Sequence, residues 1–263
     1  MNNLNILIVE GNNREDSQFF IKVAGASAAD NLKNLILKIE PLSNVKIINP
    51  GHDDETTNAL KNMNKFNGIV FTGGAMRLND MTDIIKKHIN FASSCFSQKK
   101  KILAICWGLQ VCSTAAGGKV NPGKNGAHIG IASDVIINNN GQKHFIYKDK
   151  KKIFTSPAFN FDEVSELPKN AVLLSSDKIN KVMGVSFNAG NSEIIGLQYH
   201  PDYEYSQMLK LIAGRKKRLF TNKNFLNDEE YENHILYIES ENELLNFYDR
   251  TCEVRNWLNY IKN

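Results

Sequence analysis

Short apolar runs alternate with segments of helical periodicity through the first half of this chain, and this alternation is the strongest constraint on its fold. The runs, rich in Leu, Ile and Val, lie at 4–9, 45–48, 68–71 and 102–105. Continuous hydrophobicity is typical of strands that are covered on both faces of a parallel sheet. Helical periodicity between the runs, as at 28–39 and 81–96, predicts the order β-α-β-α-β-α-β. We therefore expect a doubly wound α/β fold with a mostly parallel sheet.

A different pattern begins near residue 127, where short β-prone runs are separated by Asn, Gly, Asp and Pro. These runs occupy 136–137, 145–147, 152–154, 172–174, 182–187 and 194–197. They are typical of antiparallel strands added to a parallel core. After Tyr205 the chain is charged, with Leu, Tyr and Trp at roughly helical spacing as far as Ile261. We expect one domain over 1–205 and a helical C-terminal extension over 206–263 that packs on it.

Composition limits the classes of protein to which the chain can belong. With 263 residues, 42% of them hydrophobic, it can bury a substantial core. The first apolar run lacks a basic leader, and no apolar stretch approaches membrane-spanning length, so we expect a cytoplasmic protein with no membrane partner. The net charge of +4 comes from separate Lys/Arg clusters at 99–101, 148–152 and 215–218. We interpret these as solvated surface charge and expect no nucleic-acid partner.

The segment KILAICWGLQ has the layout of a nucleophile elbow around Cys106. An apolar strand ends there and a helix begins, and Ala104 and Gly108 supply the small residues that such a tight turn requires. The turn exposes the sulfur and directs the helix N-terminus towards it, which favours the thiolate. The other cysteines have no such context, and no cysteine has zinc-ligand spacing, so we expect no metal. They are Cys95, Cys112 and Cys252.

A second candidate element is Thr72-Gly73-Gly74, which follows the apolar run 68–71. The carboxyl end of that strand should lie beside the end of the Cys106 strand, where ligands collect in open α/β sheets. Attack of a thiolate on an amide creates an oxyanion that needs preorganised donors. The N–H groups of Gly74 and Trp107 would supply them, and the absence of side chains at the glycines would allow close approach. An ordinary turn at a strand end stays open as the alternative.

The proton donor for the departing nitrogen is expected at His200, in the segment GLQYHPDYE. This histidine follows the apolar run 194–197 and precedes Pro201. Asp202 and Glu204 are close enough in sequence to orient its imidazole. The other histidines lack this combination, and we expect them to be exposed to solvent. They are His52, His88, His128, His144 and His234.

Together these segments resemble the class I glutamine amidotransferases, especially the stand-alone proteins similar to the amidotransferase domain of GMP synthase. Four blocks between about residues 4 and 208 carry the resemblance: GIVFTGGAMRLND, ILAICWGLQ, NFDEV with LPKNAVLLSSD, and GLQYHPD. The resemblance implies a flavodoxin-like fold and a catalytic triad of Cys106, His200 and Asp202. It implies oxyanion donors at Gly74 and Trp107. The substrate-binding residues that it implies are Gly73, Gln110 and Asn160.

Departures from the family pattern bear on activity. The family usually has Glu at the position of Asp202, so orienting His200 requires a shifted backbone, a bridging water or the use of Glu204 instead. The family glycine two residues before the nucleophile is Ala104, which is small enough to be tolerated. Asn160 stands where stand-alone relatives often have histidine, which indicates a changed substrate or partner.

The resemblance implies hydrolysis of the glutamine side-chain amide to glutamate and ammonia through a γ-glutamyl thioester, with no cofactor. The 263 residues hold no nucleotide loop of the GxxxxGK(S/T) type, so we expect the ammonia acceptor on a separate synthetase subunit. The C-terminal extension would dock that synthetase or form a homodimer. Two alternatives stay open: a γ-glutamyl hydrolase or peptidase that acts on γ-glutamyl amines or peptides, and a catalytically impaired binding protein. A deglycase-like cysteine enzyme fits less well, because its histidine follows the nucleophile closely.

Overall fold

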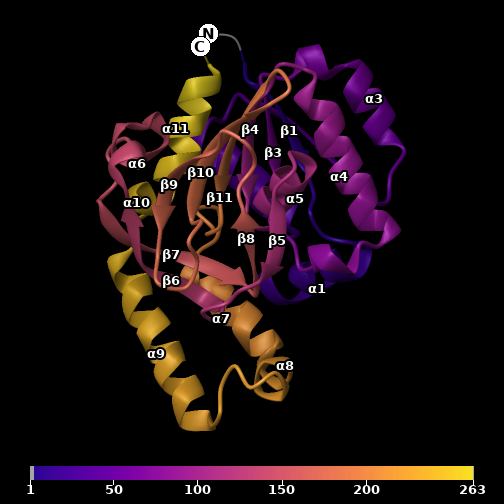
Figure 1. Cartoon of the computed structure of the whole chain (residues 1–263). Helices are drawn as coiled ribbons and strands as arrows, with labels where there is room; N and C mark the ends of the chain where they lie inside the picture. Colours follow the sequence, from indigo (N-terminus) through magenta and orange to yellow (C-terminus); the bar gives the residue numbers. More distant parts are fainter. Residues whose placement is uncertain (1–2, 263) are drawn as a thin grey trace.

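The computed structural model describes residues 3–262, which fold around a nine-stranded mixed sheet of order β2-β1-β3-β4-β11-β10-β9-β6-β7 (Figure 1). Its strands are β1 (Asn5–Val9), β2 (Asn44–Ile48), β3 (Gly68–Phe71), β4 (Lys101–Ile105), β6 (His128–Ile137), β7 (Ile153–Asn160), β9 (Val172–Ser176), β10 (Gly184–Ala189) and β11 (Ser192–Leu197). A separate antiparallel pair consists of β5 (Lys119–Pro122) and β8 (Asp162–Glu166). The helices are α1 (Arg14–Ala24), α2 (Ala28–Ile39), α3 (Glu55–Lys61), α4 (Asp83–Phe96), α5 (Trp107–Ala115), α6 (Asn139–Lys143), α7 (Tyr205–Gly214), α8 (Lys216–Thr221), α9 (Asp228–Leu244), α10 (Phe247–Arg250) and α11 (Cys252–Ile261).

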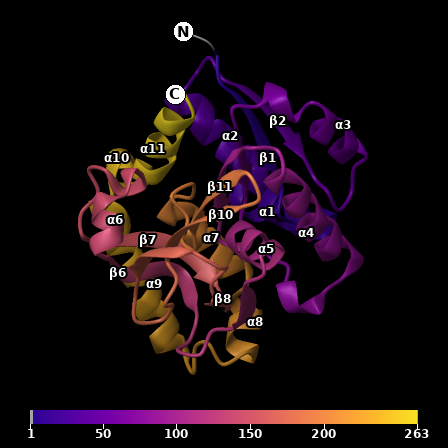
Figure 2. The ribbon, with the colours of Figure 1, turned by 45° about the horizontal axis from the view of Figure 1, so that its top comes forward.

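The half of the sheet formed by β2, β1, β3, β4 and β11 is parallel, as the alternation of apolar runs and helical segments predicted. Along β1, Ile6 and Ile8 pack with side chains of α2 and α11 on one face. Leu7 and Val9 pack with α3, α4 and α5 on the other face. Figure 2 shows α10 and α11 on the opposite side of the molecule from α3 and α4. Because helices cover both faces, the inner strands carry apolar residues at consecutive positions, as at 6–9, 69–71 and 102–105, rather than at alternate ones.

The other half of the sheet is built by antiparallel pairing of β10, β9, β6 and β7, which confirms the predicted antiparallel addition. One predicted strand is wrong, because Phe145–Tyr147 forms a short 3-10 helix. His144 caps this turn by accepting a hydrogen bond from the N–H of Ile146 at 3.3 Å. A run of three apolar residues suits a buried helical turn as well as a strand, and Ile146 and Tyr147 are both buried.

The chain after Tyr205 is helical, as predicted, and it meets the sheet at two places. Ile212 of α7 and Ile238 of α9 pack with Ile131 of β6, and Figure 1 shows α7, α8 and α9 below the ends of β6 and β7. Helix α11 packs in the largest apolar cluster. There the ring of Trp257 lies so close to Gly68 that a Cβ atom at Gly68 would be 2.7 Å away. The last helix therefore completes the core of the parallel sheet.

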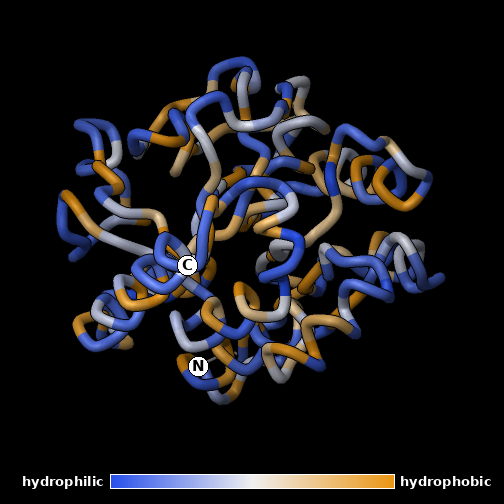
Figure 3. Tube along the Cα trace, turned by 90° about the horizontal axis from the view of Figure 1, so that it is seen from below, coloured by the Kyte–Doolittle hydropathy of each residue, from blue (hydrophilic) through white to orange (hydrophobic). Residues whose placement is uncertain are grey.

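Helices α1, α2 and α4 are amphipathic, and the side chain of a polar residue caps the N-terminus of each. In α2, Leu32 and Ile36 are buried against the sheet, and the side chain of Ser27 accepts a hydrogen bond from the N–H of Asp30. Figure 3 shows hydrophilic and hydrophobic stretches alternating along the outer helices. Among the described residues, no helix is both long enough and apolar enough to span a bilayer.

Candidate active site

Cys106 occupies the junction between β4 and α5, and its backbone is strained as a nucleophile elbow requires. Its φ and ψ angles are 51° and −106°, a region that L-residues rarely adopt. The N–H of Cys106 donates to the carbonyl of Leu197 at 2.7 Å, which holds the bend against β11. Gly108 is required because a Cβ atom there would lie 2.4 Å from the carbonyl oxygen of Phe71. The close contact between α5 and β3 therefore depends on a residue without a side chain.

The diglycine loop after β3 lies beside this bend, since β3 and β4 are adjacent and parallel. A Cβ atom at Gly74 would lie 2.4 Å from the carbonyl oxygen of Gly11, and one at Gly73 would lie 2.5 Å from Cε1 of His200. The N–H of Gly11 donates to Oγ1 of Thr72 at 2.8 Å, which ties the loop to the end of β1. Trp107 is the first residue of α5, so its N–H has no partner within the helix. The loop and the helix terminus thus border the same pocket.

His200 follows β11, which pairs with β4, so its imidazole comes to the pocket that also contains Cys106. Its Nδ1 atom is 3.1 Å from Oδ1 of Asp202. The shorter side chain of Asp202 therefore contacts the imidazole directly. The side chain of Glu204 points elsewhere, because its Oε1 accepts a hydrogen bond from Arg250 at 3.2 Å. Of the two carboxylates that the sequence offered, Asp202 rather than Glu204 contacts the imidazole.

Burial works to lower the pKa of His200, but the charges of Asp202 and the Cys106 sulfur and their hydrogen bonds outweigh it. These interactions raise the pKa of His200 from its ordinary 6.5 to about 10. Because the pKa in the folded protein lies above the unfolded value, the bound proton stabilises the fold fully below about pH 6.5. That stabilisation is lost as the pH rises towards 10. At neutral pH the imidazole is protonated beside the sulfur.

We expect the basic limb of the kcat/KM profile to lie near pH 10, because His200 must be protonated to donate to a leaving nitrogen. In Asp202→Asn the buried imidazole loses its carboxylate partner, so its pKa falls and the basic limb moves down by at least about one pH unit. Glu204→Gln is the matched control, since Glu204 contacts Arg250 rather than His200, and its limb should stay in place. A basic limb that stays near pH 10 in Asp202→Asn would contradict the assignment of Asp202 as the partner of His200.

Arg250 of α10 holds the backbone on which His200 and Asp202 are presented. Its buried guanidinium donates to the carbonyl oxygens of Pro201 at 3.1 Å and Tyr203 at 3.3 Å. Asn31 of α2 donates to the carbonyl of Asp202 at 2.8 Å. The C-terminal extension therefore takes part in shaping the site, a contribution that no local sequence pattern indicated.

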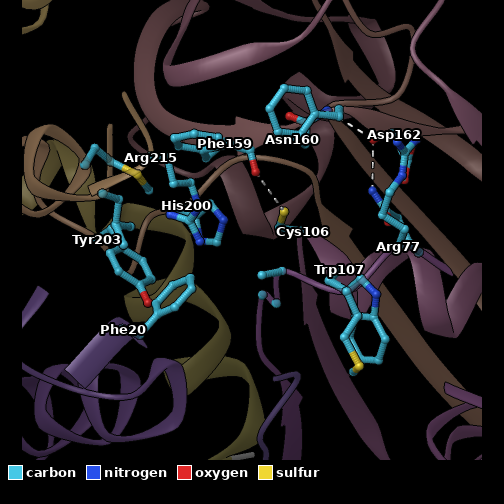
Figure 4. Close-up of a pocket in the computed structure, with 18 of the residues that line it drawn as sticks. Phe20, Arg77, Cys106, Trp107, Phe159, Asn160, Asp162, His200, Tyr203 and Arg215 are labelled. Atoms are coloured by element: carbon cyan, nitrogen blue, oxygen red, sulfur yellow. Dashed lines mark hydrogen bonds and ion pairs between the residues drawn. The ribbon is translucent and has the colours of Figure 1, made fainter. Parts of the chain in front are cut away.

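A polar wall lies on one side of Cys106 (Figure 4). Arg77 forms a bidentate ion pair with the buried carboxylate of Asp162. Gln110 of α5 donates to the backbone carbonyl of Asp162 at 2.9 Å. Gln198, which the sequence did not single out, donates from Nε2 to the sulfur of Cys106 at 3.4 Å. Arg77, Asp162 and Gln110 line this side of the pocket, and the Gln198 amide contacts the sulfur without lining the pocket.

Asn160 lies at the pocket, but its side-chain amide is bonded away from it. Its Oδ1 is 2.9 Å from Nδ1 of His128, and its Nδ2 donates to the carbonyl of Asp162 at 3.1 Å. His128 in turn contacts Asp177 at 2.8 Å. The amide of Asn160 thus positions the loop before β8, and the sequence pattern, which placed it against substrate, did not indicate these partners.

The remaining histidines are less exposed than expected, since two are buried and three are half-buried: His52, His144 and His234. His128 is buried in the network with Asn160, and His88 is buried with its ring 5.0 Å from that of Trp107. Burial lowers the pKa of His88 to about 3, so it stays neutral. The three cysteines without an elbow context are buried, and burial raises the pKa of each thiol: Cys95, Cys112 and Cys252.

The opposite wall of the pocket is aromatic and aliphatic (Figure 4). The ring of Tyr203 lies 5.1 Å from the imidazole of His200 and 6.4 Å from the ring of Phe20. Phe20 belongs to α1, and Met208 and Leu211 of α7 pack in the same apolar cluster. The sequence did not indicate this wall, because α1 and α7 are far apart in the chain and meet only in the folded molecule.

The fold and this arrangement define the class of protein. A family model described as glutamine amidotransferase class-I matches residues 24–214, and the chain belongs to that family. A crystal structure of a glutamine amidotransferase from Thermotoga maritima has the same fold. It shows a TM-score of 0.71 and 16% identity, with 99% of each chain covered.

Similar proteins of known name fall into two groups. The gamma-glutamyl-L-1-hydroxyisopropylamide hydrolase of Pseudomonas sp is 27% identical over 77% of this chain and 68% of its own length. Gamma-glutamyl peptidase 5 of Arabidopsis thaliana is 31% identical, over 58% of this chain and only 60% of the peptidase. In the second group, a glutamine-hydrolysing GMP synthase subunit from Methanococcus vannielii is 30% identical over 55% of this chain and 69% of its length.

Proposed function

We propose that this chain hydrolyses γ-glutamyl amide bonds through a thioester on Cys106. The observation that supports the proposal best is that Cys106, at a strained elbow, lines the same pocket as His200, whose pKa the sulfur helps to raise. On the polar wall, Arg77 and Asp162 offer charges opposite to those of the α-carboxylate and α-ammonium groups of a glutamyl unit.

In the proposed reaction the Cys106 thiolate attacks the amide carbon, and the N–H groups of Gly74 and Trp107 stabilise the oxyanion. The Nε2 proton of His200 passes to the nitrogen as the C–N bond breaks, and the amine leaves. Water then gives a proton to the same imidazole and attacks the thioester carbon, which releases glutamate and restores the thiolate. Asp202 keeps Nδ1 of His200 engaged, so that Nε2 faces the reacting atoms.

The apolar wall favours a substituted amine over ammonia as the leaving group. The nitrogen must face His200, and beyond His200 lie the buried side chains of Tyr203, Phe20 and Met208. Ammonia has no group to place there, whereas an alkyl amine would cover this apolar surface. The names of the Pseudomonas and Arabidopsis relatives, a γ-glutamyl amide hydrolase and a γ-glutamyl peptidase, also support a substituted amine as the leaving group. A glutaminase that passes ammonia to a separate synthetase is the second candidate, supported by the similarity to the GMP synthase subunit from Methanococcus vannielii.

A substrate panel tests the proposal. Glutamate release should be measured from glutamine and from γ-glutamyl isopentylamide at matched concentrations. We expect kcat/KM to be at least about 10-fold higher for the alkyl amide, because its chain buries apolar area that glutamine lacks. Turnover of glutamine alone would favour the ammonia-transfer candidate. Absence of turnover, together with no labelling of Cys106 by a diazo-ketone analogue of glutamine, would contradict an enzymatic role.

A further inference from the structure

Arg215 stands at the end of the apolar wall, where α7 gives way to α8. Its guanidinium carbon lies 4.7 Å from the ring centroid of Phe19, 5.2 Å from that of Phe20 and 5.2 Å from that of Phe159. The residue lines the same pocket as Cys106 and His200, and Figure 4 shows it on the side of His200 and Tyr203. Three aromatic rings therefore fix the position of a half-buried cation on the wall that faces the leaving amine.

Within residues 3–262, no hydrogen bond or ion pair engages the guanidinium of Arg215. Burial lowers its pKa to about 10, so it remains charged at neutral pH. The negative charge of Asp16 raises the pKa of Arg215, but the two side chains are not within ion-pair distance. The hydroxyl of Tyr203, on the same wall, is also buried without a hydrogen-bond partner. A buried hydroxyl is costly to leave without a hydrogen bond, so the Tyr203 hydroxyl indicates a polar group of a ligand on this wall.

Arg218 also lines the pocket, but its side chain is exposed to solvent. Arg77 and Arg250 differ from Arg215 in having partners within the protein. The guanidinium of Arg77 is paired with Asp162, and that of Arg250 donates to Pro201, Tyr203 and Glu204. Both guanidinium groups are therefore held by groups of the protein. Arg215 has five donors and a planar shape suited to a carboxylate, and these remain free for a bound molecule.

The side of the pocket on which Arg215 lies decides which part of a substrate it would meet. The proton donor to the departing nitrogen is His200, so the leaving amine must extend from the sulfur towards His200 and Tyr203. The γ-glutamyl part is then left to the opposite wall, where Arg77 and Asp162 lie. A ligand on the Arg215 side would meet apolar surface from Phe20 and Met208 and a cation at its end.

On the basis of the proposed function, we infer that Arg215 selects γ-glutamyl amides whose leaving amine is an amino acid with an apolar side chain. The carboxylate of that amine would pair with the Arg215 guanidinium, and its side chain would cover the aromatic wall. The preferred substrates are thus γ-glutamyl dipeptides with a free carboxyl terminus. Uncharged alkyl amides and glutamine would be turned over less efficiently, since they leave the cation without a partner.

The test compares γ-glutamyl-leucine with γ-glutamyl isopentylamide, which is the same molecule without the carboxylate. In the wild type we expect kcat/KM to be about 10- to 100-fold higher for the dipeptide, mostly because its KM is lower. A gain of this size is typical of charge-assisted hydrogen bonds. Arg215→Gln should reduce this ratio to near one, and Arg215→Lys should retain part of it, because charge remains but bidentate geometry is lost. Lys217→Gln, which removes an exposed positive charge nearby, should leave the ratio unchanged.

The ratio of the two kcat/KM values distinguishes a role of Arg215 in substrate recognition from a purely structural role. A purely structural role for Arg215 would lower turnover of both compounds equally and preserve the ratio, which would overturn the inference. A wild-type ratio near one would overturn it as well, while leaving the proposed hydrolysis intact. Failure to cleave any γ-glutamyl amide would instead overturn the proposed function together with the inference.

Discussion

Replacement of Cys106 by alanine is expected to lower turnover of every γ-glutamyl amide by on the order of 10⁴-fold or more, because no other cysteine within residues 3–262 lines the pocket. The variant should remain folded, since alanine retains the Cβ atom and the Cys106 backbone is held by the bond to Leu197. Steady-state release of glutamate and the thermal unfolding midpoint should be measured on the same preparation.

Cys112→Ala is the matched control for this change. Cys112 lies in the same helix, α5, and is buried in the apolar cluster that this helix shares with α4. Its truncation should cost about 1 kcal/mol of stability at most and leave labelling by a diazo-ketone glutamine analogue intact. Cys106→Ala should abolish that labelling. Turnover that survives in Cys106→Ala, or labelling that is lost in Cys112→Ala, would contradict the nucleophile assignment.

Replacement of Glu253 by alanine is expected to destabilise the fold by about 3–5 kcal/mol, because it leaves a buried charge without its partner. Glu253 is fully buried in α11, 3.1 Å from Nζ of Lys150, whose side chain is 4% exposed. The Tyr199 hydroxyl also donates to Glu253, at 2.7 Å. Tyr199 immediately precedes His200, so this network joins the last helix to the site. Urea unfolding gives the free energy directly.

A surface ion pair provides the comparison for Glu253. In the pair between Lys119 and Glu166 both side chains are more than half exposed, so Glu166→Ala should cost no more than about 1 kcal/mol. The double variant Lys150→Met with Glu253→Leu should recover much of the lost stability, since it removes both charges and retains apolar volume. Equal losses for Glu253→Ala and Glu166→Ala would show that the buried pair does not hold α11 in place.

Local patterns in the chain predicted the parts of the site that neighbouring residues create. Cys106 lies at a strand-to-helix junction, and the small residue two positions later, Gly108, permits the contact with β3 that the bend needs. The Gly73-Gly74 loop and His200 each follow an apolar strand, and parallel strands bring their carboxyl ends to one edge of the sheet. The meeting of these strand ends at one edge of the sheet can therefore be expected before any contact is known.

The same patterns misjudged residues whose environment is made by distant segments. Phe145–Tyr147 forms a helical turn rather than a strand, because its apolar residues are buried by the surrounding core. The rings of His88 and His128 are buried, although we expected them to be exposed to solvent. The identity of a single polar residue does not indicate which distant segments will pack over it. The partners of the Asn160 amide, His128 and Asp162, were likewise not indicated by any local pattern.

The sequence by itself determined the doubly wound architecture and the junctions at which Cys106 and His200 lie, because hydrophobic periodicity and tight turns depend on residues close together in the chain. Only the tertiary structure decided what surrounds those two residues. Phe20 and Arg215 reach one wall of the pocket from separate helices, and Arg250 reaches the Asp202 segment from the C-terminal extension. Such contacts arise from helix packing across the molecule. A local pattern of residue types therefore does not predict which distant side chain will line the pocket.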